Sequence, residues 1–144
     1  VLNTLPEANI KPRLRMITIY AIAQQNSYIV CGGSNKDEIM YGYFTKYGDS
    51  GVDMMPMADL LKGEVRLLAE YMGVPREIID RAPTAGQWDG QTDESEMGLS
   101  YDTLDRFLAT GEADTDSKAK ITKAISRSEH KRKFAMIAEL PKNL

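Results

Sequence analysis

With 144 residues, the chain is long enough for one domain or for part of one. Its 42% hydrophobic and 27% charged residues are typical of a globular protein. A formal net charge of −3 and a pI near 5.2 argue against nucleic-acid and membrane-surface binding. The single cysteine excludes an internal disulfide and favours a reducing compartment, and no apolar run approaches the roughly 20 residues that span a bilayer.

The N-terminal part of the sequence predicts a loop followed by a helix. Residues 1–11 contain Pro6 and Asn9 and are expected to form the loop. Apolar residues recur at helical spacing over 13–25, and this broadly apolar helix is expected to pack on a sheet. Arg13 and Arg15 lie in its first turn, where the helix dipole disfavours cations, so they are either solvated or paired with an anion.

The stretch Cys31 to Asp53 is the most informative part of the sequence. An apolar strand is predicted over 28–31, a glycine turn at Gly32 and Gly33, and a helix over 36–43. A strand, a glycine turn and a helix together place backbone N–H groups beside an anion. Glu38 falls in the first turn of that helix, where its carboxylate can meet a metal ion held by phosphates.

Residues 52–81 predict an edge strand and two helices. The apolar run 52–57 is interrupted by Pro56, which favours an edge strand over a central one. A helix is predicted over 59–72, capped by Asp59 and ended by Gly73, and a short one over 76–81. Lys62 lies near the start of the longer helix, where a cation is again unfavourable for the dipole, so it is either solvated or paired with an anion.

The last third of the sequence combines an acidic loop with a basic helix. Residues 82–98 are glycine-rich and acidic, and a loop of this length in a compact domain is often functional or mobile. Helices are predicted over 100–108, ended by Gly111, and over 117–132. Most charges of the loop and of the last helix are expected to be solvated, although the two segments could also meet each other or an anionic ligand.

The remaining chemistry points to anion binding. The sequence has no Cys-x-x-Cys or His-x-x-x-His pair, which argues against a protein-held zinc ion, and its only histidine, His130, has no evident nucleophile. Glycine turns, one well-placed carboxylate and several cations remain. Together they suit polyphosphate bound with Mg²⁺, and the cations concerned are Arg13, Lys46, Lys62 and Lys131.

Nearly the whole chain resembles one enzyme family, the ammonia-dependent NAD synthetases. The most specific segment is the run from Gly42 to Asp49, GYFTKYGD. The likeness continues, in order, through the segments 9–16, 33–38, 51–53, 59–62, 82–85, 90–94, 99–102 and 128–132.

The resemblance implies an α/β fold: a partial doubly wound parallel sheet of the adenine-nucleotide alpha-hydrolase-like (ATP pyrophosphatase) type, with helices on its faces. Residues 1–144 would be the C-terminal part of a single NAD synthetase domain. The family's ligases use ATP and Mg²⁺ to adenylate deamido-NAD, and ammonia then converts the acyl-adenylate to NAD and AMP. The resemblance also implies a cytoplasmic homodimer.

The same resemblance implies a role for individual residues. Glu38 would be a magnesium ligand. Lys62, Thr84 and Gly33 would contact ATP. Deamido-NAD would be held by Asn9, Arg13, Lys46, Asp53, His130 and Lys131. Since phosphates would account for cations at unfavourable positions, Arg13, Lys46 and Lys62 are expected to face one shared cleft.

The sequence departs from the family pattern in two ways. Gly33 stands where members often have threonine, so a hydroxyl contact to ATP would have to come from Ser34 or from a backbone N–H. The family's serine-glycine-glycine-x-aspartate-serine pyrophosphate loop is absent, and the chain opens with Val1 rather than methionine. We therefore expect residues upstream, and we expect this chain alone to be inactive and, as a half-sheet with an unpaired strand, poorly stable.

Two alternatives remain open at this point. One is another ATP-pyrophosphatase amidotransferase, for example one acting on a purine nucleotide, although the run from Lys46 to Asp53 and the pair His130 and Lys131 argue against it. The other is a truncated, non-catalytic module for dinucleotide binding or dimerisation, which the missing phosphate loop favours for the isolated polypeptide.

Overall fold

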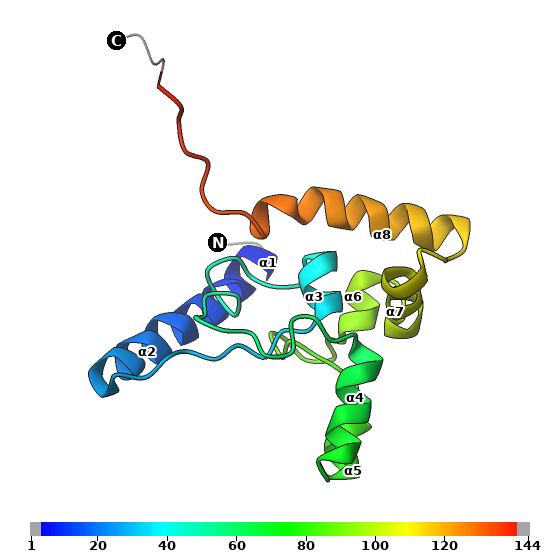
Figure 1. The fold of residues 1–144 in the computed structure, drawn as a ribbon, viewed down its shortest axis with the longest axis horizontal. Helices are drawn as coiled ribbons and strands as arrows, with labels where there is room; N and C mark the ends of the chain where they lie inside the picture. The colour runs from blue at the N-terminus through cyan, green and yellow to red at the C-terminus, as the bar shows by residue number, and fades with distance from the viewer. Residues whose placement is uncertain (1–3, 141–144) are drawn as a thin grey trace.

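The computed structural model describes residues 4–140, which form helices joined by extended segments and turns (Figure 1). Within that range the elements are α1 (Thr4–Ala8), α2 (Ile10–Asn26), α3 (Lys36–Tyr41), α4 (Lys62–Tyr71), α5 (Arg76–Ile79), α6 (Asp93–Met97), α7 (Tyr101–Thr110), α8 (Thr115–Ser128) and the 3₁₀ helix η1 (Glu129–Lys131). No helix in the described part combines the length and the apolarity needed to cross a membrane.

The two segments predicted as strands run parallel but pair at a single point. Cys31 and Met54 form an isolated parallel bridge, and the Gly32 N–H donates to the Met54 carbonyl at 2.9 Å. The Asp53 N–H donates to the Val30 carbonyl, also at 2.9 Å. Residues 4–140 contain no strand longer than this single bridge. The predicted doubly wound sheet is therefore not confirmed by this structure.

The core lies where α6, α7 and α8 meet. Tyr101, Leu104 and Ile121 are completely buried, and Met97 is nearly so. This cluster joins the apolar stripes of two amphipathic helices, as the helical spacing of those residues predicts. Helix α3 packs against α7 and α8, and α4 packs against α7. The core therefore fixes α3 and α4 relative to each other, and these two helices carry Glu38 and Lys62.

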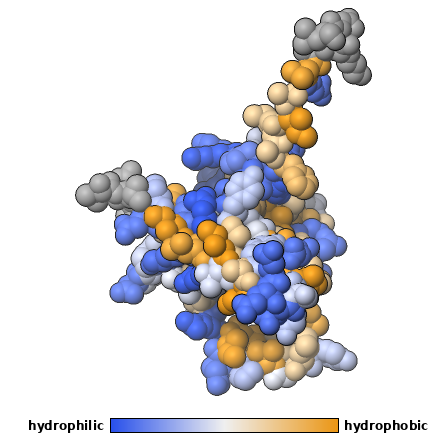
Figure 2. Space-filling view, turned by 90° about the vertical axis from the view of Figure 1, so that its left-hand side faces the viewer, coloured by the Kyte–Doolittle hydropathy of each residue, from blue (hydrophilic) through white to orange (hydrophobic). Residues whose placement is uncertain are grey.

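Much of the apolar surface lies outside this core. On α2, Leu14, Ile17 and Ile22 are each more than half exposed, so the predicted packing of this helix on a sheet is not seen. Leu67 in α4 and Met72, which follows the last residue of that helix, are exposed as well. Figure 2 shows patches of hydrophobic residues between hydrophilic ones on the face that it presents.

Three local predictions were wrong. The segment expected to be a loop before residue 12 contains α1 and the first residues of α2, and Ala8 packs inside. Asp59 does not cap α4: it forms an ion pair with Lys36 at 3.0 Å, and the first N–H groups of α4 are held by carboxylates from elsewhere in the chain. The acidic loop contains α6, because Thr92 caps a turn there by accepting the Ser95 N–H.

Candidate functional site

Glu38 and Lys62 lie side by side between α3 and α4. Asn35 caps α3, and Glu38 returns the interaction by accepting the Asn35 N–H at 3.3 Å. The Lys62 ammonium lies 3.5 Å from Glu38 Oε1, and each side chain is about one-fifth exposed. Burial raises the pKa of Glu38, while the positive charge of Lys62 acts in the opposite direction. The structure thus brings together the proposed magnesium ligand and one of the proposed phosphate contacts.

A cavity of about 360 Å³ opens beside Glu38. Four of the predicted site residues line it: Asn9, Glu38, Thr84 and Lys131. The aromatic side chains Tyr43 and Phe44 line it as well, from the segment that follows α3. A cavity with apolar rings and a few convergent polar groups is typical of a small-molecule site.

The acidic wall of this cavity was not predicted as part of the site. Asp93 is buried, and its Oδ2 accepts from the Tyr101 hydroxyl at 2.8 Å, while its Oδ1 has no hydrogen-bond partner within residues 4–140. Glu96 accepts from the Tyr43 hydroxyl and from Gln91 Nε2. Burial and the nearby carboxylates raise the pKa of both tyrosines, which therefore remain hydrogen-bond donors.

Part of the signal for this wall was present in the sequence, because Gln91 and Asp93 lie in the segment 90–94 that carries part of the family resemblance, whereas Glu96 lies outside that segment. The acidic wall was not identified from the sequence, because most charges of this segment were expected to be solvated. Asp93 contacts Tyr101 at the start of the next helix, whereas Glu96 contacts Tyr43, which lies 53 positions away, and no local pattern reveals that second contact.

A second group of predicted residues lies where three parts of the chain meet: α2, η1, and the segment that follows α3. The Lys46 ammonium donates to the His130 carbonyl at 2.5 Å, and Arg13 Nε donates to the Lys46 carbonyl at 3.3 Å. The His130 ring lies 3.1 Å from the Arg127 carbonyl. Residues 33 to 117 positions apart in the sequence are thus brought into one group, as their common proposed role requires.

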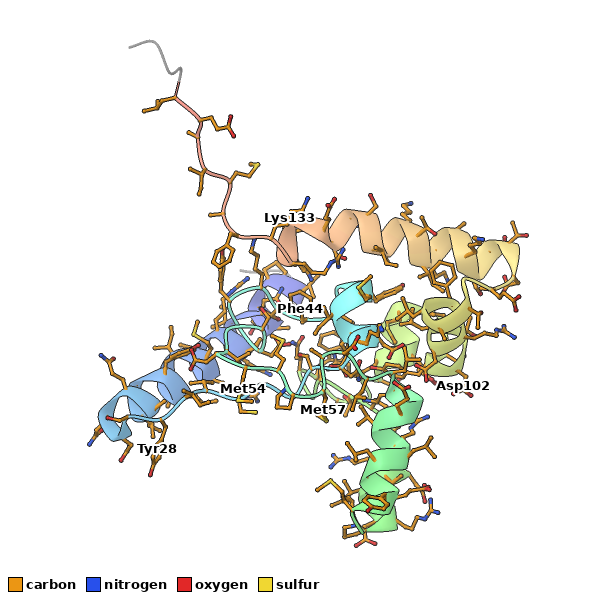
Figure 3. The ribbon with its side chains drawn as sticks, in the orientation of Figure 1. Tyr28, Phe44, Met54, Met57, Asp102 and Lys133 are labelled. Atoms are coloured by element: carbon orange, nitrogen blue, oxygen red, sulfur yellow. The ribbon has the colours of Figure 1, made fainter. Side chains whose placement is uncertain are left out.

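Lys131 joins this group to the cavity. Its ammonium donates to the carbonyls of Gly42 and Phe44, both at 2.8 Å, and lies 5.2 Å from the centre of the Phe44 ring. Burial lowers the pKa of Lys131, although Asp49 opposes that shift. Figure 3 shows Phe44 below the C-terminal end of α8, with Lys133 near it in the segment that follows η1. The lysine therefore fastens the C-terminal segment to the aromatic wall of the cavity.

Asp53 and Gly33 belong to neither group, whereas Thr84 lines the cavity described above. Asp53 accepts the Val30 N–H at 2.6 Å and the Tyr20 hydroxyl at 3.0 Å, so it ties α2 to the extended segment. Gly33 is exposed, and a Cβ added there would meet no atom within 4 Å, so the turn has room for the larger residue of the family pattern. Thr84 accepts the Gly86 N–H at 3.1 Å.

The expectation of one cleft shared by Arg13, Lys46 and Lys62 is not confirmed. Lys62 lines a second cavity of about 460 Å³, together with Thr84, and neither of these two cavities is lined by all three cations. Arg13 and Lys46 lie together near η1, whereas Lys62 lies at Glu38. Thr84 lines both cavities and so marks where they adjoin.

The donor set near Glu38 fits Mg²⁺ better than a metal held by protein alone. Within residues 4–140 no group of three or more histidine, cysteine, aspartate or glutamate side chains could hold a metal ion. Magnesium is usually bound through one or two carboxylates together with water and substrate phosphates. Glu38 supplies one carboxylate, and Asp93, whose buried Oδ1 has no hydrogen-bond partner among the described residues, lines the same cavity.

Comparison with known proteins places the chain in a family. The family model for NAD synthase matches residues 2–135, and the chain belongs to that family. It is 56% identical over 128 residues to the NH(3)-dependent NAD(+) synthetase of Finegoldia magna, covering 89% of this chain and 53% of that protein. It is 49% identical over 142 residues to the enzyme of the same name from Archaeoglobus fulgidus, covering 96% and 58%.

Solved structures support the same relationship. The NMN synthetase from Francisella tularensis superposes with a TM-score of 0.93 at 41% identity, covering 97% of this chain and 59% of that one. The NH3-dependent NAD synthetase from Campylobacter jejuni gives a TM-score of 0.73 at 26% identity, covering 96% and 57%. The chain thus spans little more than half the length of these relatives.

Proposed function

We propose that this chain is the C-terminal part of the catalytic domain of an ammonia-dependent NAD synthetase. Family membership over residues 2–135 is the observation that carries the proposal. The reaction would be the ATP-dependent amidation of deamido-NAD to NAD, a ligation that forms a carbon–nitrogen bond through an acyl-adenylate. A carboxylate oxygen of deamido-NAD attacks the α-phosphorus of ATP and pyrophosphate leaves. Ammonia then attacks the acyl carbon and AMP leaves.

In this proposal the groups at α3 and α4 bind the triphosphate. Lys62 offers an ammonium group that Glu38 holds on one side. Thr84 offers a hydroxyl group between the two cavities, and Gly33 offers a backbone N–H in an open turn. Glu38 would hold Mg²⁺, which when bound neutralises phosphate charge. Since Glu38 and Lys62 lie 3.5 Å apart, an incoming phosphate and its cation would replace a contact that the two side chains make with each other.

The groups at α2, the segment after α3 and η1 would bind deamido-NAD. Lys46 and Arg13 place positive charge near η1, and Asn9 lines the cavity while its Oδ1 accepts the Thr45 hydroxyl at 2.7 Å. Lys131 fastens the C-terminal segment over the aromatic wall, and His130 lies beside it. Such a segment would restrict water near a reactive acyl-adenylate. Asp53 acts through the backbone that it holds.

A second candidate function is the same chemistry on a mononucleotide. The relative with a TM-score of 0.93 is an NMN synthetase, and the corresponding reaction would convert nicotinate mononucleotide to its amide. Both reactions need the ATP site, so they differ only in whether the enzyme also binds the adenylate half of a dinucleotide. The ratio of kcat/KM for the two acids decides between them.

The assembly and location of the enzyme follow from the same proposal. We propose a cytoplasmic homodimer that takes ammonia as nitrogen donor. The exposed apolar residues of α2 offer surface for a further segment or subunit, which is in line with a chain that spans about half of its relatives. A non-catalytic module for dinucleotide binding is the alternative for the isolated chain.

The test is to join this chain to the preceding half of the Finegoldia magna relative and to supply ATP, Mg²⁺, ammonia and deamido-NAD. The proposal predicts NAD, AMP and pyrophosphate in equal amounts. The intact relative serves as the positive control, and far-UV circular dichroism checks that the chimera is folded. A folded chimera that makes neither NAD nor NMN from the corresponding acids rejects the enzymatic function.

A further inference from the structure

The first turn of α4 is held by two carboxyl groups from other helices. The Lys62 N–H donates to Asp37 Oδ2 on α3 at 2.8 Å and to Asp105 Oδ1 on α7 at 3.2 Å. The Gly63 N–H donates to Asp105 Oδ2 at 2.8 Å. Free N–H groups at a helix N-terminus are commonly satisfied by a side chain just before the helix. Here the acceptors lie 25 and more than 40 residues away, so three helices are tied together at one point.

The two carboxyl groups also face each other. Asp37 is completely buried, and its carboxyl group and that of Asp105 accept from the same Lys62 N–H, so the two carboxyl groups lie close together. Each carboxyl group accepts one of the two shortest hydrogen bonds from the first turn of α4, both at 2.8 Å. Both carboxyl groups are therefore needed to hold the first turn of α4.

Space around the pair is fully used. A Cβ added to Gly63 would lie 2.9 Å from Asp105 Oδ2, so the carboxylate approaches the backbone more closely than any other residue at this position would allow. Helix α7 is in turn anchored by Tyr101 and Leu104, both completely buried. The start of α4 therefore has little freedom to shift relative to α3 and α7.

The Lys62 side chain leaves from this fixed point. Its ammonium lies 3.5 Å from Glu38 Oε1 and 4.9 Å from the centre of the Tyr101 ring. A lysine is a point charge on a flexible four-carbon stem, so its position is defined only if its backbone is. Of the three contacts that define it, one comes from α3, one from α7 and one from the backbone held by the two aspartates.

We propose that Asp37 and Asp105 are positioning residues that clamp the start of α4 and thereby place the Lys62 ammonium beside Glu38. Their importance for catalysis rests on the proposed function, in which Lys62 meets a phosphate of ATP. Neither aspartate touches substrate. Their contribution is to reduce the ordering that Lys62 must undergo when the phosphate arrives.

The first test reports on lysine position without any activity. Because the Lys62 side chain lies over the Tyr101 ring, its ε-protons carry a ring-current shift that NMR of the chain measures. Asp37→Ala and Asp105→Ala should lose most of that shift. Asp37→Asn should keep it, since the amide can accept from Lys62 and donate to Asp105.

The control is Asp102→Asn, which removes an exposed carboxylate from the same helix (Figure 3) and should change nothing. If the alanine variants do not fold, Asp105→Asn keeps the shape of the side chain and removes one acceptor, and it should reduce the shift. An unchanged Lys62 shift in folded variants of both aspartates overturns the proposal.

The second test uses MgATP as the probe, by calorimetric titration of the full-length chimera. Asp37→Ala and Asp105→Ala should weaken MgATP binding about tenfold, which corresponds to about 1.4 kcal/mol. Asp37→Asn should weaken it less than twofold. Tight binding by the alanine variants overturns the link between the clamp and the phosphate. If the unsubstituted chimera does not bind MgATP, the proposed ATP site fails, and the NMR shift still decides the clamp independently.

Discussion

Asp37 should make the stability of the protein depend on pH in a way that Asp37→Asn abolishes. Burial, and secondly the contact with Asp105, raise the pKa of Asp37 from the ordinary 3.8 to about 7. A carboxyl whose pKa is raised by folding binds its proton more tightly in the folded state. Its contribution to stability is therefore full below about pH 4 and is lost as the pH rises through about 7.

The size of the effect follows from the same two values. They differ by about three pH units, and each unit corresponds to about 1.4 kcal/mol, so the upper limit is about 4 kcal/mol. Because the local structure relaxes around the buried carboxyl group, we expect a change of about 2–4 kcal/mol. That is a large part of the total stability of a small domain.

Urea unfolding followed by circular dichroism, at several pH values between about 4 and 8, measures the effect. The free energy of unfolding of the unsubstituted chain minus that of Asp37→Asn should fall across this range, since the amide does not titrate. Asp102→Asn controls for the loss of one exposed carboxylate. A difference that is flat, or that rises with pH, would refute the assignment of a neutral buried carboxyl to Asp37.

Three further substitutions, and Gly73→Ala as a control for one of them, test the packing of the chain by the same unfolding measurement. Gly42→Ala should cost about 2–4 kcal/mol, because φ is +82° and the new Cβ would overlap Ser128. Gly73→Ala, at φ +74° with open space around the new Cβ, should cost only about 1–2 kcal/mol. Equal losses of stability for Gly42→Ala and Gly73→Ala would contradict the overlap with Ser128. Lys131→Met should cost about 2–3 kcal/mol by leaving two carbonyls unpaired, and a loss below about 0.5 would contradict the anchor. Leu104→Ala should cost about 2–5 kcal/mol, whereas a neutral result would mean that the core lies elsewhere.

The helices were predictable because their signals are local. Helical spacing of apolar residues located α2, α4, α7 and α8, and the C-terminal glycines Gly42 and Gly111 adopt the left-handed conformation that ends a helix. Ser100 caps α7 by accepting the Thr103 N–H, which the sequence pattern before an apolar run favours.

The first residue of a helix was predictable only where a side chain close in sequence accepts the first N–H groups of that helix. Asp59 is a good capping residue by type and position, yet α4 begins three residues later. The acceptors at its first turn are Asp37 and Asp105, which are distant in sequence. The interaction that decided this boundary is tertiary, and a pattern of neighbours does not contain it.

The sheet was predicted from the family and from short apolar runs, and only the bridge between Cys31 and Met54 is present in residues 4–140. Parallel strands pair with partners that come from distant parts of the chain. The chain spans about half the length of the curated relatives it matches, and the apolar residues of α2 are exposed in the part that the structure describes.

The candidate site was half predictable. Conspicuous cations and Glu38 were identified by residue type and by resemblance, and the structure groups Glu38 with Lys62 and Arg13 with Lys46. The acidic wall at Asp93 was missed because its burial depends on hydroxyl groups from other elements. Charge alone does not distinguish a solvated acid from one that lines a cavity.

The most direct test of the proposed chemistry follows one oxygen atom. Deamido-NAD labelled with ¹⁸O in its nicotinate carboxylate is converted by the chimera in the presence of ATP, Mg²⁺ and ammonia, and the AMP is analysed by mass spectrometry. An acyl-adenylate pathway predicts that each AMP carries one ¹⁸O atom, because the attacking oxygen leaves with the phosphate. Unlabelled AMP, or label in inorganic phosphate alongside ADP, would contradict the account.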